Sequence, residues 1–215
     1  MSMNNRGLSA PTTADGTAPG LGKDLGPRLS SARKGAGVGL RALARQIGVS
    51  PALISQIESG RTAPSVSTLY AIATALDLSF DYLFRGDTGA VERSGPAAVR
   101  VQHGDQRPTV RLASGVRWER LTWTVRNDFE FLHVVYETDS ASCDEGTLLQ
   151  HGGEEYAYVL SGRLGLTIGP DSYELAPGDS INFDAQTPHR IWNAGGEPAS
   201  AIWAVLQRRF DERAS

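Results

Sequence analysis

Residues 40–59 constrain the fold more than any other stretch, because several independent local signals agree within it. Apolar residues keep helical spacing on both sides of a short break at Gly48-Val49-Ser50. They are Leu43, Ala44 and Ile47 before the break, and Ile54 and Ile57 after it. Ala44 is small enough for a crossing helix to come close, and Gly48 permits a positive φ in the turn. The stretch therefore predicts two short helices joined by a tight turn.

The second of these helices has a well-defined start. Ser50 can cap its N-terminus, and Pro51 loses nothing at the first helical position by lacking an N–H group. Together these features predict a helix-turn-helix, an arrangement whose second helix enters the major groove of DNA.

The distribution of charge agrees with this interpretation, although the whole-chain net charge of −3 indicates no partner. Residues 22–85 carry eight Lys/Arg against four Asp/Glu, a net +4, whereas residues 86–215 carry a net −7. A basic segment joined to an acidic body is typical of a DNA-binding module with a partner domain that does not bind DNA.

Helical periodicity extends on both sides of this motif. Residues 1–22 are rich in Gly, Ser, Thr and Pro, and we expect a disordered tail there. Residues 23–85 predict five helices, one before the motif and two after it, with Ser65 capping the fourth. The glycines of residues 35–39 should end the first helix.

Residues 21–84 resemble the lambda-repressor-like, XRE-family helix-turn-helix domain. The resemblance is carried by Gly48-Val49-Ser50, by residues 54–61 (Ile-Ser-Gln-Ile-Glu-Ser-Gly-Arg) and by Pro64-Ser65. It implies that Ser55 and Gln56 read base edges, while Pro51 and Ala52 offer apolar contact, for instance to a thymine methyl group. The residues better placed for phosphate contacts are Arg41, Gln46, Ser50, Arg61 and Ser65.

Other charged residues of this domain are open to two interpretations. Arg33 and Arg45 could contact DNA or could simply be solvated. Glu58 is acidic on a DNA-facing helix, so we expect it to orient a neighbouring arginine or to cap locally rather than to touch DNA.

After a linker-like segment at residues 86–98, the pattern changes from helical periods to short β-runs over residues 99–210. Nine runs separated by Gly, Pro, Asp and Asn favour a sandwich or barrel. They are residues 110–112, 116–125, 129–137, 156–160, 163–168, 172–175, 180–183, 189–192 and 199–206.

Two motifs in this region resemble the paired motifs of the cupin family, a small β-barrel of the double-stranded β-helix or jelly-roll type. The first runs from His151 to Gly162, and the second comprises residues 177–183 followed by 188–193. The resemblance covers residues 130–206. It implies that the chain is a two-domain protein with a five-helix head and a C-terminal cupin barrel.

Metal-binding cupins usually use three histidines and a glutamate. Matched by position, His151, Glu155 and His189 fill three of these places, and Leu149 occupies the fourth. Because leucine cannot coordinate a metal, we expect no resident cofactor. The three remaining groups could still form a 2-His-1-carboxylate site for Fe, Mn, Zn or Ni, or they could line an organic-ligand pocket. His103 and His133 lie outside the motifs and are expected to be structural or exposed.

Strand alternation predicts the lining of the barrel. If Glu155 points inward, Ala157 and Val159 follow, and Tyr156 and Tyr158 face outward. Ile191 should point inward with His189. Trp118 and Trp123 have opposite parity and should not share a face. The result is an apolar cavity with a few polar groups, as in small-molecule sites.

The single cysteine, Cys143, and the lack of an apolar leader or a bilayer-length segment lead us to expect a cytoplasmic protein that does not engage membranes. We expect a transcriptional regulator, by default a repressor, that binds operator DNA as a homodimer paired through its barrels and senses a small-molecule effector. One alternative is a cupin metalloenzyme, a dioxygenase or isomerase tethered to DNA, although no further acid–base group stands near the motifs. Another is an antitoxin-like DNA-binding protein, which leaves the barrel without a role.

Overall fold

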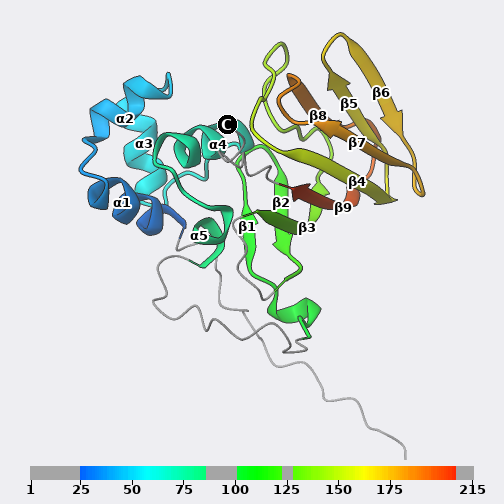
Figure 1. Ribbon diagram of the computed structural model, residues 1–215, viewed down its shortest axis with the longest axis horizontal. Helices are drawn as coiled ribbons and strands as arrows, with labels where there is room; N and C mark the ends of the chain where they lie inside the picture. The colour runs from blue at the N-terminus through cyan, green and yellow to red at the C-terminus, as the bar shows by residue number, and fades with distance from the viewer. Residues whose placement is uncertain (1–24, 86–100, 123–127, 207–215) are drawn as a thin grey trace, which may run out of the picture.

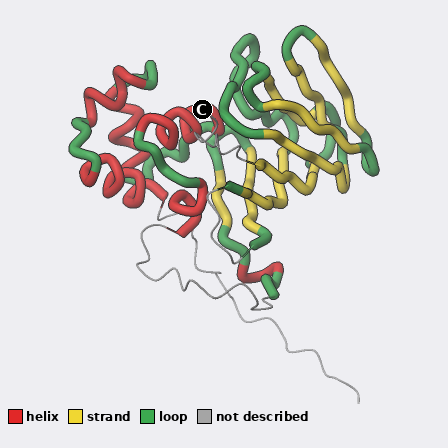
Figure 2. Tube along the Cα trace, in the orientation of Figure 1, coloured by secondary structure: helices red, strands yellow, loops and turns green. Residues whose placement is uncertain are grey.

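The computed structural model describes residues 25–85, 101–122 and 128–206. The predicted tail at 1–22 and the predicted linker at 86–98 lie outside these residues. The α-helices gather on one side of the molecule and the strands on the other, with one short 3-10 helix (Gly104–Gln106) below the strands (Figure 2). Within the described ranges, no helix is both long and apolar enough to cross a bilayer.

Five helices form the head, as predicted. They are α1 (Leu25–Gly35), α2 (Leu40–Gln46), α3 (Pro51–Glu58), α4 (Val66–Ala75) and α5 (Phe80–Arg85). The turn between α2 and α3 has the predicted chemistry: Gly48 has φ +73°, and the Ser50 hydroxyl accepts a hydrogen bond from the Leu53 amide at 3.1 Å. The predicted apolar residues of the motif are buried, apart from Ile47, which is half-buried.

The crossing of α1 and α3 depends on a glycine that the periodicity did not indicate. A Cβ atom on Gly26 of α1 would lie 2.2 Å from the carbonyl oxygen of Ile57 on α3. A side chain at position 26 would therefore push α1 away from α3. This glycine sets how closely α1 packs on the end of the second motif helix.

Over residues 101–122 and 128–206, the structure has nine strands, at the positions of the nine predicted runs. They are β1 (Thr109–Arg111), β2 (Val116–Arg120), β3 (Phe129–Tyr136), β4 (Glu154–Ser161), β5 (Leu164–Ile168), β6 (Asp171–Leu175), β7 (Ser180–Asp184), β8 (His189–Asn193) and β9 (Ala199–Leu206). The second run was predicted too long, since β2 ends at Arg120. Trp123, predicted to face away from Trp118, lies outside the described residues.

Two antiparallel sheets make up this domain, one ordered β1-β2-β3-β9-β4-β7 and the other β6-β5-β8. The predicted alternation is confirmed on β4, where Glu155, Ala157 and Val159 are buried and Tyr156 and Tyr158 are exposed. On β8, His189 and Ile191 are both buried, also as predicted. Glu155 and His189 of the cupin-like motifs therefore point into the space between the sheets.

The head and the barrel are in direct contact, with α4 and α5 on the side of the head that faces the barrel (Figure 1). Within the part of the chain that the structure describes, two backbone hydrogen bonds join the domains: the amide of Ser67 donates to the carbonyl of Ser142 at 3.2 Å, and that of Ala113 donates to the carbonyl of Pro64 at 2.9 Å. Both bonds lie at the N-terminal end of α4. The start of this helix is thus fixed to the barrel.

Candidate DNA-binding surface and barrel pocket

The predicted base-reading residues share one solvent-exposed face of the head. Pro51, Ala52, Ser55 and Gln56 on α3 are all exposed, whereas Ile54 and Ile57 on the opposite face are buried. Three predicted phosphate-contact residues, Arg41, Gln46 and Arg61, are also exposed. The head therefore leaves free the side chains that DNA recognition would need.

Two other residues predicted to contact phosphate, Ser50 and Ser65, cap helices within the head. The Ser50 hydroxyl caps α3, and the Ser65 hydroxyl caps α4 by accepting from the Thr68 amide at 3.1 Å. Ser65 also lies next to Pro64, which bonds to the barrel. Ser65 is accordingly on the side of the head that faces the barrel.

Arg33 and Glu58 form a nearly buried ion pair that connects α1 to the end of α3. Nη2 of Arg33 donates to Oε2 of Glu58 at 2.8 Å, and the Ser30 hydroxyl donates to the same oxygen at 2.8 Å. Arg33 also donates to the Val38 carbonyl. Burial alone would raise the pKa of Glu58, but the bonds from Arg33 and Ser30 outweigh it and lower the pKa. The prediction that Glu58 orients an arginine is confirmed, and Arg33 is a structural residue, not a solvated one.

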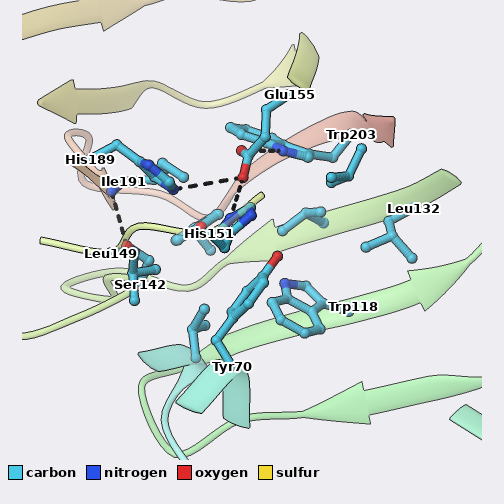
Figure 3. Close-up of a pocket in the computed structure, with 14 residues that line it drawn as sticks. Tyr70, Trp118, Leu132, Ser142, Leu149, His151, Glu155, His189, Ile191 and Trp203 are labelled. Carbon is cyan, nitrogen blue, oxygen red and sulfur yellow. Dashed lines mark hydrogen bonds and ion pairs between the residues drawn. The ribbon is translucent and has the colours of Figure 1, made fainter. Parts of the chain in front are cut away.

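A pocket opens between the two sheets of the barrel, and its wall includes residues of the head. The space between its side chains is about 30 Å³, room for one or two water molecules. Its lining is apolar apart from a small polar cluster (Figure 3). The lining residues are Val66, Tyr70, Trp118, Leu132, Val134, Tyr136, Ser142, Leu149, His151, Glu155, His189, Ile191, Trp203 and Val205.

The Glu155 carboxylate is the centre of the polar cluster (Figure 3). Its Oε1 lies 2.7 Å from Nε2 of His151 and 3.6 Å from Nε2 of His189. Its Oε2 accepts a hydrogen bond from the indole N–H of Trp203 at 2.8 Å. The structure thus brings together the three predicted residues from the β4 strand, the loop before it and the start of β8.

Backbone carbonyls orient both imidazoles. Nδ1 of His189 lies 2.9 Å from the carbonyl of Thr187, and Nδ1 of His151 lies 3.1 Å from that of Gly152. If these Nδ1 atoms carry the protons, both Nε2 atoms direct their lone pairs toward Glu155. This is the orientation in which metal-ligating histidines are usually held.

The pKa values of the two histidines are shifted in opposite directions. For His151, burial alone would lower the pKa, but the hydrogen bond and charge of Glu155 raise it above the ordinary value. For His189, burial prevails over the attraction of Glu155, and the pKa is lowered. In the absence of a cation, His151 is therefore the partner that pairs with the carboxylate.

These three residues fit a divalent metal ion. Their ligand atoms lie within 4.8 Å of one another. The donor set is the 2-His-1-carboxylate combination. Leu149 lines the same pocket, paired through its backbone with His189, so the position of the missing fourth ligand faces the cluster.

Sequence reasoning missed Tyr70, which lies on α4 of the head and reaches into the pocket (Figure 3). Its ring stacks on that of His151, with centroids 4.4 Å apart and planes 14° from parallel. It meets Trp118 edge to face at 5.9 Å. Helical periodicity suggested only a residue of the head, since the pattern contains no information on how the domains dock.

The expectation that no further acid–base group stands near the motifs was wrong. Glu130 on β3 lies in the same cross-strand row as Glu155, through Val205 of β9. Burial, followed by the charge of Glu155, raises the pKa of Glu130 well above its usual range, against the opposing charge of Arg120. The sequence could have indicated this, because Glu130 alternates in step with Leu132 and Val134, which point inward on the same strand.

The two histidines outside the motifs are placed as expected. His133 faces outward and bonds to Glu119, and His103 is exposed.

Comparison with known proteins supports both domains. A family model described as helix-turn-helix matches residues 29–83, and one described as a cupin domain matches residues 140–205. The chain is 28% identical over 201 residues to the HTH-type transcriptional regulator PuuR of Escherichia coli K12, covering 91% of this chain and 98% of PuuR. It is 27% identical over 177 residues to SutR of the same organism, covering 82% and 90%.

A solved structure has the same arrangement of domains. A helix-turn-helix family transcriptional regulator from Vibrio cholerae aligns with a TM-score of 0.62 and 25% identity, covering 88% of this chain and 98% of that one. The chain thus has an XRE-type helix-turn-helix domain followed by a C-terminal cupin domain, and over both domains it is similar to transcriptional regulators.

Proposed function

We propose that this regulator binds operator DNA in the cytoplasm as a homodimer and responds to a small-molecule effector held in the cupin barrel. The exposed face of α3, with Ser55 and Gln56 at its centre, is the observation that carries DNA binding. A five-helix head offers a small interface, so specific binding is expected to need two heads on a two-fold-symmetric site. The apolar barrel pocket with one polar cluster is suited to the effector.

The outer face of the six-stranded sheet supports dimerisation through the barrel. Residues of β3, β9 and β4 line up there in cross-strand rows, and the rows are mainly apolar and aromatic. They comprise Phe129, Phe131, Tyr156, Tyr158, Ile202, Ala204 and Leu206. Tyr158 is 48% exposed and Leu206 is 41% exposed, so a second copy would cover apolar surface that one chain leaves in water.

Repression is the default direction of regulation, and two experiments test the proposal. A footprint of the purified protein on its own promoter region should show sequence-selective protection with two-fold symmetry. Mass spectrometry of small molecules released from natively purified protein should identify the effector. Absence of sequence-selective binding in the footprint would refute the regulator function.

Arg61→Ala should weaken binding to all DNA sequences alike. Arg61 is exposed just after α3, where its guanidinium can reach a phosphate without reading a base. Loss of one such contact should reduce the slope of log K against log salt by about 1. Binding titrations at several salt concentrations measure the slope. The control is Arg163→Ala, which removes an exposed barrel arginine paired with Glu174 and should leave the slope unchanged. If both substitutions change the slope equally, Arg61 does not contact DNA.

The metal-site geometry favours a second candidate function, a metalloenzyme in which His151, Glu155 and His189 hold a divalent ion. A bound ion would supply a Lewis acid with open coordination positions. Near-stoichiometric iron or manganese in purified protein, together with turnover of a substrate, would establish this function in place of pure sensing.

Leu149→His should restore the fourth ligand and tighten metal binding. The side chain of Leu149 lines the pocket beside the three donors. The gain in Zn²⁺ affinity should exceed the roughly tenfold effect typical of a second-shell partner, as measured by calorimetry. His103→Ala, at an exposed site outside the pocket, is the control. Equal affinity of wild type and Leu149→His would show that position 149 does not face the ion.

A further inference from the structure

Helix α4 belongs to both domains at once. Leu69, Ile72 and Ala73 are buried in the head core, while Val66 and Tyr70 line the barrel pocket. The two sets are interleaved along one side of the same short helix, since Val66, Leu69, Tyr70 and Ala73 are spaced three, four and seven residues apart. A change in the pocket that moves Tyr70 must therefore act on a helix that also contributes to the head core.

The Tyr70 ring fills a slot that is already shaped for a planar group. Its ring lies parallel to the imidazole of His151 at 4.4 Å and edge-on to the indole of Trp118 at 5.9 Å. Burial, followed by the charges of Glu155 and Glu130, raises the pKa of the Tyr70 phenol, which agrees with a hydroxyl aimed toward the carboxylates. In Figure 3 the side chain rises from α4 toward His151 and Glu155.

With Tyr70 in place, the pocket has little free space for an organic effector. The remaining space of about 30 Å³ suits water or a single ion, whereas sites for small organic ligands usually measure roughly 300–1,000 Å³. Removal of a phenol ring from the wall of this cavity is the most direct way to enlarge it. The residue that must leave is then one that the DNA-binding head contributes.

We propose that the ring of Tyr70 occupies the place of the effector, and that the effector is a small planar ring compound that takes this slot and expels Tyr70 together with α4. The inference rests on the proposed function, because it assumes that the barrel binds the effector and that the head binds DNA. The effector cannot occupy the pocket while Tyr70 and the head are docked on the barrel. Effector binding thereby frees the head from the barrel and changes how two heads are held on an operator.

Competition by a tethered side chain has a measurable consequence. If the pocket is open for about 1–10% of the time, the apparent affinity of a ring ligand is reduced about 10- to 100-fold relative to a pocket without the competitor. Tyr70→Ala should remove that reduction. The matched probe is p-cresol, which has the structure of the tyrosine side chain.

Calorimetry with p-cresol tests the slot. Tyr70→Ala should bind p-cresol about 10- to 100-fold more tightly than wild type, since an apolar cavity of matching shape accepts the missing ring. Tyr173→Ala removes an exposed tyrosine of β6 outside the pocket and should behave as wild type does. Tyr70→Phe keeps the ring and should also resist the probe. If Tyr70→Ala binds p-cresol no better than Tyr173→Ala, the proposal is overturned.

Hydrogen exchange tests whether the head is released. Among the described residues, the amides of Ser67 and Ala113 donate the backbone hydrogen bonds that join the domains, so their exchange rates report docking. Both amides should exchange faster in wild type saturated with p-cresol than in wild type without it, and unchanged protection of both would refute coupling. In Tyr70→Ala, where p-cresol takes the place of the missing ring beside a docked helix, the ligand should not speed exchange. If Tyr70→Ala loses helical signal and so fails to fold, Tyr70→Leu replaces it in both measurements, because leucine also removes the ring. Neither readout involves DNA, so failure of these tests is distinct from failure of the footprint.

Discussion

Glu58→Gln is expected to lower the free energy of unfolding of the head by about 3 kcal/mol, because it leaves Arg33 nearly buried without its counter-charge. The two domains can be followed separately, since all four tryptophans lie beyond residue 117 and none lies in the sequence of the head. Far-UV circular dichroism in denaturant reports the helical head, and tryptophan fluorescence reports the barrel. The loss should appear in the helical signal.

The pH dependence of this effect has a definite sign. The folded-state pKa of Glu58 is lowered, so the stabilisation is complete above the unfolded pKa of about 4.3 and is lost as pH falls through the folded pKa. Wild type and Glu58→Gln should therefore differ most near neutral pH and converge in acid. The double change Arg33→Met/Glu58→Leu should recover part of the loss, because no unpaired charge remains.

Asp77→Asn is the matched control for the ion pair. Asp77 is an exposed acid of the same head, at a positive φ of 51° that asparagine tolerates. Its replacement should change stability by less than about 0.5 kcal/mol. If Glu58→Gln and Asp77→Asn have the same free energy of unfolding, the Arg33–Glu58 pair does not hold α1 on α3.

Gln56→Ala should relax base preference at one or two operator positions, at a cost of about 1–3 kcal/mol on the preferred sequence. The Gln56 side chain is exposed near the middle of α3, and its amide can both donate to and accept from a base edge. Competition binding with operators substituted one position at a time measures the preference. The loss should be confined to the positions that Gln56 reads.

Gln46→Ala is the matched control for base reading. Gln46 is also an exposed glutamine, but it ends α2 and is predicted to contact phosphate. Its removal should weaken binding without changing sequence preference. If Gln56→Ala leaves the preference intact, the register assigned to the recognition helix is wrong.

The local structure of the head could be predicted because its signals lie close together in the chain. Gly48, Ser50 and Pro51 act through φ, a cap and a missing N–H group within a few residues, and each has the predicted effect. By contrast, the close approach at Gly26 depends on where a different helix passes. No local pattern contains that information.

The same distinction applies to the barrel site. Strand alternation placed Glu155 and His189 inside, since neighbouring side chains on a strand point to opposite faces, and motif spacing added His151. Glu130 was within reach of the same reasoning, through the parity of Leu132, but its pairing with the Glu155 row depends on β9 lying between the two strands.

The sequence alone determined the helix-turn-helix, the strand positions and the three polar residues of the pocket, because each follows from side-chain spacing along one element or motif. Only the tertiary structure decided what closes that pocket. Tyr70 belongs by periodicity to the head, yet its ring stacks on His151 of the barrel. That contact follows from the docking of two domains, which depends on surfaces assembled from residues far apart in the chain.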